Sequence, residues 1–113
     1  NILIDLSNKF GAQPIFITQR TYNWIEKDKK IYSLPYILTK TNLDINNHYT
    51  YEKFVSDTVI SNCEKKNIFC INLFEQLKLN MNDTYDFTHM NPNGSSKVSN
   101  VIFENLKNYV IFD

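Results

Sequence analysis

The chain has 113 residues, of which 42% are hydrophobic and 14% are aromatic, and this size suits one compact domain rather than two. Twelve Lys and Arg residues balance twelve Asp and Glu residues, so the zero net charge gives no sign of a basic patch for nucleic acid or anionic membrane. No apolar run approaches the roughly 20 residues that a membrane span requires. We therefore expect a folded domain with no nucleic-acid partner and no membrane span.

The first half of the chain predicts a helix, a buried strand and a long loop. Apolar residues recur at helical spacing from Ile2 to Phe10, and Gly11 follows as a stop signal. The run from Pro14 to Gln19 is short, apolar on both faces and rich in β-branched residues, as in a buried parallel strand. Residues 20–48 show no clean period and predict a long connection, which in a compact domain is usually functional or mobile.

The second half predicts two helices around a second strand. The helical period returns from Tyr49 to Lys66, and Asn67 marks a stop. An apolar strand is predicted from Ile68 to Leu73, with a short helical turn over 74–79. Asn91 and Pro92 are a strong helix start, and helical spacing then continues to Val110. We therefore expect Ile15–Thr18 and Ile68–Ile71 to be adjacent parallel strands joined through a helix, as in a βαβ unit.

The two cysteines, Cys63 and Cys70, fall late in a predicted helix and in the next predicted strand. Their positions allow a disulfide, but we expect two buried free thiols. The sequence has no CxxC motif and no Cys and His pairing at zinc-ligand spacing, so it predicts neither a metal nor another cofactor.

The segment "DFTHMNPNG", from Asp86 to Gly94, carries the strongest chemical signal. Asp86 and His89 are three residues apart in a turn before the last predicted helix, which lets the carboxylate reach one imidazole nitrogen. A carboxylate there fixes the tautomer and stabilises the imidazolium, while the other nitrogen stays free to face a nucleophile. An isolated D-x-x-H is common by chance, and a loop histidine is more often a surface residue. The position one loop after a buried strand favours function, because sites collect there in parallel sheets.

Other candidate residues carry weaker signals. Tyr22 and Trp24 follow the carboxyl end of the first strand, so they are candidates for lining a substrate cleft, with packing over the core as an equal alternative. His48 lies in a predicted polar loop and is better explained as a solvated residue than as a ligand. The charged run from Lys27 to Lys30 is most simply a solvated turn.

"DFTHMNPNG" followed by an amphipathic helix resembles the last motif block of the SGNH (GDSL-type) hydrolases. That block reads Asp-x-x-His, an apolar residue, Asn or a similar residue, two variable residues and Gly, and every position is matched between Asp86 and Gly94. The preceding order is also similar: strand "PIFITQ", a variable loop, an amphipathic helix and strand "IFCINLF". The resemblance covers nearly the whole chain, specifically in the last block and generically elsewhere.

The resemblance implies a flavodoxin-like three-layer α/β/α fold, with residues 1–113 as the C-terminal half of such a domain. It also implies that His89 is the general base of a serine hydrolase and Asp86 its orienting partner. The family's serine lies in a Gly-Asp-Ser-type motif, and its oxyanion hole draws on that serine and on a glycine and an asparagine. This sequence contains no Gly-Asp-Ser and no Gly-x-Asn-Asp, and Ser95 and Ser96 read as first-turn residues of the last helix.

The sequence thus predicts the C-terminal portion of a serine esterase, lipase or carbohydrate O-acetylesterase that lacks its nucleophile. The partners expected are an ester substrate and the missing N-terminal half. Two alternatives stay open: a non-catalytic α/β interaction or accessory chain, and a half-site completed by a separate chain. The acyl group, the compartment and the oligomeric state are not specified by the sequence.

Overall fold

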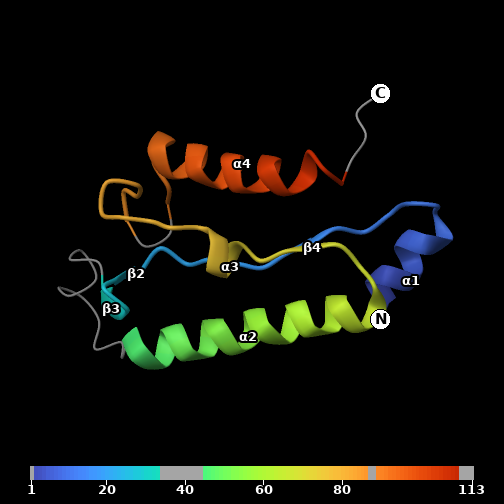
Figure 1. The fold of residues 1–113 in the computed structure, drawn as a ribbon, viewed down its shortest axis with the longest axis horizontal. Coiled ribbons are helices and arrows are strands. Elements are labelled where there is room, and N and C mark those ends of the chain that lie inside the picture. Colours follow the sequence, from blue (N-terminus) through green and yellow to red (C-terminus); the bar gives the residue numbers. More distant parts are fainter. Residues whose placement is uncertain (1, 34–44, 87–88, 110–113) are drawn as a thin grey trace.

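A computed structural model describes residues 2–33, 45–86 and 89–109 of the chain. In chain order the elements are α1 (Ile2–Lys9), β1 (Phe16–Ile17), β2 (Trp24–Lys27), β3 (Lys30–Ser33), α2 (Ile45–Lys66), β4 (Cys70–Ile71), α3 (Leu73–Gln76) and α4 (Pro92–Leu106). The chain is a mixed α and β protein (Figure 1).

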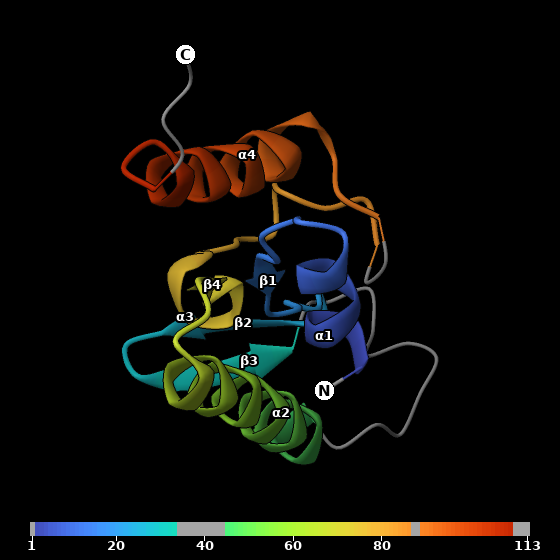
Figure 2. The same cartoon turned by 90° about the vertical axis from the view of Figure 1, so that its right-hand side faces the viewer.

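The strands β1 and β4 are adjacent and parallel, as the sequence predicts. Phe16 is paired with Cys70, and Ile17 with Ile71. Figures 1 and 2 show α2 and α4 on opposite sides of this pair. The described residues hold two separate two-stranded sheets, β1–β4 and β2–β3. The mixed α/β character is therefore confirmed, whereas a three-layer flavodoxin-like sheet is not formed by this part of the chain.

Local sequence signals explain where three of the helices end or begin. Gly11, two residues after the end of α1, takes a φ of 68°, and Asn67, directly after α2, takes a φ of 52°. Both angles lie in the left-handed region that ends helices. At the start of α4 the Asn91 side-chain oxygen accepts the backbone N–H groups of Asn93 and Gly94, and Pro92 occupies the first turn. The predicted stops and the predicted cap are confirmed.

The region from 20 to 48 differs from the prediction of a long loop. The antiparallel strands β2 and β3 form a hairpin there, and α2 begins at Ile45, four residues before its predicted start. The hairpin turns at Asp28 and Lys29, whose φ angles of 52° and 60° are the conformation of a two-residue type I′ turn. The predicted turn at 27–30 is thus confirmed, while residues 34–44 lie outside the described residues.

Cys63 and Cys70 form a disulfide, so the expectation of two free thiols is wrong. Their Cα atoms are 6.2 Å apart, a separation that disulfides commonly span. The chain turns sharply between them: the N–H of Ile68 donates to the carbonyl of Cys63 at 2.9 Å, beyond the left-handed Asn67. The bond therefore ties the C-terminal end of α2 directly to β4.

The apolar core lies between α3, the segment after it and α4. Its centre is formed by Leu73, Leu77 and Leu79, against which four partly buried residues pack: Tyr22, Met90, Val98 and Val101. The strand β1 is less buried than predicted, because Ile15 and Ile17 are 36% and 44% exposed. The prediction of a strand buried on both faces is therefore wrong for this chain.

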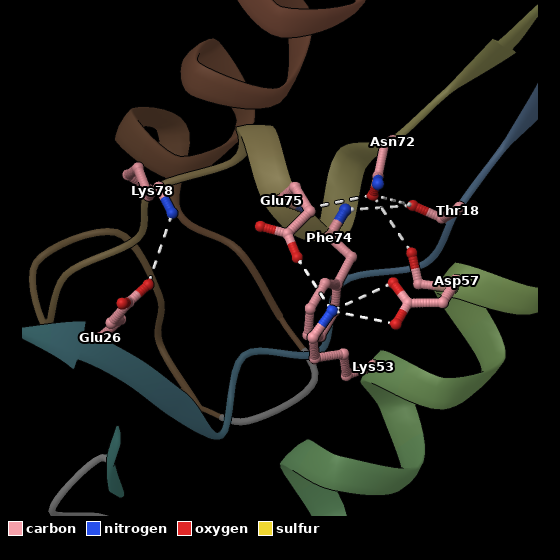
Figure 3. A network of polar contacts seen from close by, with 9 residues as sticks. Thr18, Glu26, Lys53, Asp57, Asn72, Phe74, Glu75 and Lys78 are labelled. Atoms are coloured by element: carbon pink, nitrogen blue, oxygen red, sulfur yellow. Dashed lines mark hydrogen bonds and ion pairs between the residues drawn. The ribbon is translucent and has the colours of Figure 1, made fainter. Parts of the chain in front are cut away.

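A polar network fixes the junction of β1, β4, α2 and α3 (Figure 3). The side-chain oxygen of Asn72, the residue directly after β4, accepts three hydrogen bonds, from Thr18 Oγ1, Ser56 Oγ and the backbone N–H of Glu75. Thr18 Oγ1 in turn accepts the N–H of Phe74 at 3.1 Å. Because Thr18 and Ser56 are almost completely buried, these bonds satisfy groups that would otherwise be costly to bury.

Replacement of both cysteines by alanine should lower the free energy of unfolding by about 2–3 kcal/mol, because the disulfide constrains the unfolded chain. Thermal denaturation followed by circular dichroism should show a fall in Tm of roughly 10 °C. A reductant should lower the Tm of the unmodified chain in the same way and leave that of the Cys63→Ala/Cys70→Ala variant unchanged. Equal Tm values for the two chains under oxidising conditions would contradict the disulfide.

Candidate functional site

The Asp86 and His89 pair lies on the loop between α3 and α4. Figure 1 shows this loop at the end of the molecule toward which both β1 and β4 run, beside the β2–β3 hairpin. The loop closes on itself, because Thr84 and Met90 form an antiparallel bridge and the N–H of Tyr85 donates to the carbonyl of His89 at 2.9 Å. Asp86 and His89 therefore sit at the tip of a short closed loop at the carboxyl end of the parallel pair.

The Asp86 carboxylate makes the contact with His89 that the sequence predicts. His89 Nδ1 lies 2.8 Å from Asp86 Oδ2 and 3.0 Å from Oδ1, and Oδ1 also accepts the backbone N–H of His89 at 2.7 Å. An ionised Asp86 accepts a proton held on Nδ1, and this tautomer leaves the lone pair on Nε2. Since 71% of the His89 side chain is exposed, Nε2 is open to a reacting group.

The start of α4 holds the base of this loop. Asn91 caps the helix with its side-chain oxygen, and its side-chain N–H donates to the carbonyl of Asn82 at 2.7 Å. The backbone N–H of Asn91 donates to the carbonyl of Asp83 at 3.1 Å. Asn91 therefore caps the helix and also attaches the loop to it. These two roles explain why an asparagine suits the first Asn position of "DFTHMNPNG".

Gly94 allows the loop and the helix to touch. A Cβ atom at this position would lie 2.1 Å from the backbone oxygen of Asp83 and 3.3 Å from Met90 Cβ. The first distance is far below van der Waals contact, and the atom concerned belongs to the backbone, so no side chain fits without moving the loop. The glycine of the motif is thus required by close packing and not by its φ angle.

Trp24 is buried and Tyr22 is half-buried. Trp24 is 4% exposed and packs edge-on against Tyr49, with ring centroids 4.6 Å apart. Its indole N–H donates to Glu52 at 2.8 Å, while Tyr22 packs against the leucine core. These positions favour the alternative of packing over the core, and a substrate contact for either residue stays a prediction.

Arg20 and Glu52 are buried charged residues that no sequence pattern had singled out. Arg20 follows β1, is 3% exposed and stacks 3.2 Å above the Trp24 ring. Glu52 accepts the backbone N–H and the hydroxyl of Thr21 as well as the Trp24 indole N–H. Burial lowers the pKa of Arg20 to about 10, an effect that the Glu52 carboxylate partly opposes, so the guanidinium keeps its charge at neutral pH.

The remaining candidates have simpler explanations. His48 belongs to the first turns of α2 and its Nε2 is buried, so its placement in a solvated loop was wrong. Ser95 and Ser96 are exposed in the first turn of α4, as predicted. Within the described residues, no group of three or more His, Cys, Asp or Glu side chains could hold a metal ion. No helix in that part of the chain has the length and apolar character needed to cross a membrane.

Comparisons with protein-family models, curated proteins and solved structures find no match to this chain.

Gly94→Ala should shift the loop away from α4 and lower the free energy of unfolding by about 1–3 kcal/mol, as overpacking of a close contact does. The amide of Asn91, which donates to Asp83, should exchange its hydrogen faster than in the unmodified chain. Ser95→Ala, at the neighbouring exposed position, should change stability by less than about 0.5 kcal/mol. Chemical denaturation and hydrogen-exchange mass spectrometry measure both effects, and equal behaviour of the two variants would refute the close contact.

Proposed function

We propose that this chain is the C-terminal part of an SGNH-type serine ester hydrolase, in which His89 is the general base and Asp86 orients it. The observation that supports the proposal is the 2.8 Å contact between Asp86 Oδ2 and His89 Nδ1, in a segment that matches the family's last block at every position. The parallel pairing of β1 and β4 agrees with the expected architecture. The complete domain is then a flavodoxin-like three-layer fold.

The chemistry follows from the free Nε2. As a serine hydroxyl attacks the ester carbonyl, His89 Nε2 takes the hydroxyl proton, and the imidazolium then gives that proton to the departing alcohol. Water hydrolyses the acyl-serine by the same proton transfers. Asp86 stays ionised and stabilises the imidazolium through Nδ1. The substrate class is an ester such as an O-acetyl group, a lipid or a carbohydrate ester.

The serine and the oxyanion hole belong to polypeptide outside these 113 residues. The sequence lacks the motifs that supply them in the family, and in the described part of the chain no hydrogen bond joins a serine to His89. A base without its nucleophile retains little catalysis, because triad members act as a unit. This chain alone is therefore inactive.

The exposed side of β1 is where the missing polypeptide fits. In the described part of the chain β1 pairs with β4 alone, and the N–H groups of Phe16 and Thr18 point to that partner. The backbone of Ile17 therefore faces the other edge, which is open to a further strand. Sheets most commonly have about four to six strands, so a further strand at this edge would bring the pair closer to the usual size.

Exposed apolar surface gives the same indication. The stripe that makes α1 amphipathic is 49–82% exposed at Ile2, Leu3, Leu6 and Phe10. A groove of about 500 Å³ lies beside β1, and apolar residues such as Ile17, Tyr51 and Val55 line it together with polar residues of α2 and of the segment after β1. Exposed apolar side chains grouped in this way are typical of interaction sites. We propose that the missing N-terminal half, or a separate chain equivalent to it, covers this surface.

The second candidate function is a non-catalytic interaction or accessory chain. The observation in its favour is the 71% exposure of the His89 side chain, which leaves the pair without the dry surroundings that strengthen catalytic electrostatics. Activity that depends on His89 distinguishes the two candidates, because an accessory chain has no use for the base.

The purified 113-residue chain should show no saturable turnover of p-nitrophenyl acetate, and its excess rate over the His89→Ala variant should not exceed that of free imidazole at the same concentration. The physical reason is that the chain lacks a nucleophile and the donors of an oxyanion hole. The loss of one such donor typically lowers kcat by about 10²–10³-fold. Release of p-nitrophenolate gives the measurement. Saturable turnover above the rate of free imidazole, abolished by His89→Ala, would mean that a serine nucleophile lies within these residues, which would overturn the half-site.

The assembly isolated from the native source through a tag on this chain should hydrolyse the same ester. Asp86→Asn should lower kcat on the order of 10⁴-fold, because the amide favours the wrong tautomer of His89. Asp57→Asn is the matched control, since Asp57 is an exposed carboxylate paired with Lys53 on α2. Equal activity of the two variants, or no ester hydrolysis by the folded assembly, would reject the proposed function in favour of the accessory chain.

A further inference from the structure

Lys97 and Asp83 form an ion pair between α4 and the loop that precedes it. Lys97 Nζ lies 2.6 Å from Asp83 Oδ2, and the Asp83 side chain is only 3% exposed, against 39% for Lys97. A carboxylate buried to this degree needs a counter-charge, because a buried charge without a partner is costly. The same oxygen also accepts the backbone N–H of Asn80 at 2.6 Å.

Asp83 is the point where the loop is fastened to the helix. Its backbone carbonyl accepts the N–H of Asn91 and lies against Gly94, so this residue contacts the start of α4 through the backbone as well as the side chain. Lys97 Nζ also reaches the carbonyl of Lys78 at 3.4 Å. One ammonium group therefore holds two points of the segment that leads from α3 into the loop.

Asp83 lies three residues before Asp86, on the same side of the loop. Thr84, the residue after Asp83, forms the bridge with Met90, and Tyr85 then donates to the carbonyl of His89. The two arms of the loop are thus held at its base, one beside Asp83 and the other beside Asn91. A fixed base restricts the conformations of the tip and lowers the entropy lost when Asp86 bonds His89.

We infer that Lys97 is a positioning residue: by neutralising Asp83 it holds the loop in the shape in which Asp86 bonds His89 Nδ1. In the described part of the chain no hydrogen bond joins Lys97 to Asp86 or His89, so it acts through Asp83. The inference rests on the proposed role of His89 as the base. Without Lys97 the buried carboxylate is left uncompensated and draws the loop toward solvent.

The test is the tautomer of neutral His89, measured by long-range proton–nitrogen NMR spectra of the labelled 113-residue chain at mildly alkaline pH. The unmodified chain should hold its proton mainly on Nδ1, because Asp86 accepts it there. Lys97→Met should lose that tautomer as the major form, since an imidazole without a partner favours a proton on Nε2. Lys97→Arg should restore it, because arginine keeps the charge.

Two internal controls separate positioning from general stability. His48, in α2, should keep the same nitrogen shifts in every variant. Lys107→Met removes another lysine near the end of α4, where it pairs with the exposed Glu104, and should leave His89 unchanged. Lys97→Gln, an uncharged variant that can still donate to Asp83, should behave like Lys97→Met.

An unchanged His89 tautomer in folded Lys97→Met would overturn the inference. Unfolding of both Lys97→Met and Lys97→Gln while Lys107→Met stays folded would also overturn it, because the pair would then serve the whole fold rather than the loop. The readout does not depend on a nucleophile. Lys97→Met could lose the Nδ1 tautomer while the native assembly shows no ester hydrolysis. That combination would support the effect of Lys97 on the loop and reject the proposed hydrolase.

Discussion

The close approach of the Asp83 carbonyl to Gly94 is the constraint on which the candidate site depends. Because no Cβ stands between them, the loop can lie directly on the first turn of α4. That contact brings Asn91 into reach of Asp83 and Asn82, and it brings Lys97, one turn further along, into reach of the buried carboxylate. Asp86 and His89, in contact at 2.8 Å, lie on the exposed side of this packed loop.

The rest of the described chain combines a well-fixed parallel pair with uncovered edges and apolar surface. The disulfide and the Asn72 network tie α2, β4 and β1 together, so the parallel pair is well fixed from within. The same pair has an unpaired edge in the described residues, and the apolar stripe of α1 faces solvent. We propose that a second polypeptide covers this apolar surface and completes the site on the loop before α4.

Much of this structure could be predicted from local sequence signals. Two short apolar runs gave the parallel strands, Asn91 and Pro92 gave the start of α4, and a three-residue spacing gave the contact between Asp86 and His89. The β2–β3 hairpin was missed because Asp28 and Lys29 adopt left-handed angles without the glycine that usually signals such a turn. The disulfide was missed because spacing alone does not tell whether two cysteines approach each other. The Asp83 and Lys97 pair depends on burial that only tertiary packing creates, although Lys97 follows Gly94 at a helical spacing of i+3 and so shares its face.

The central claim is that His89 activates a serine that lies outside these 113 residues. A fluorophosphonate probe, which reacts with activated serines, tests this claim when it is applied to the assembly isolated from the native source and followed by peptide mass spectrometry. If His89 activates such a serine, one serine in polypeptide other than this chain should be labelled, and the labelling should be lost in His89→Ala. Labelling of a serine within the chain, labelling that His89→Ala does not change, or no labelling of the folded assembly would contradict the account.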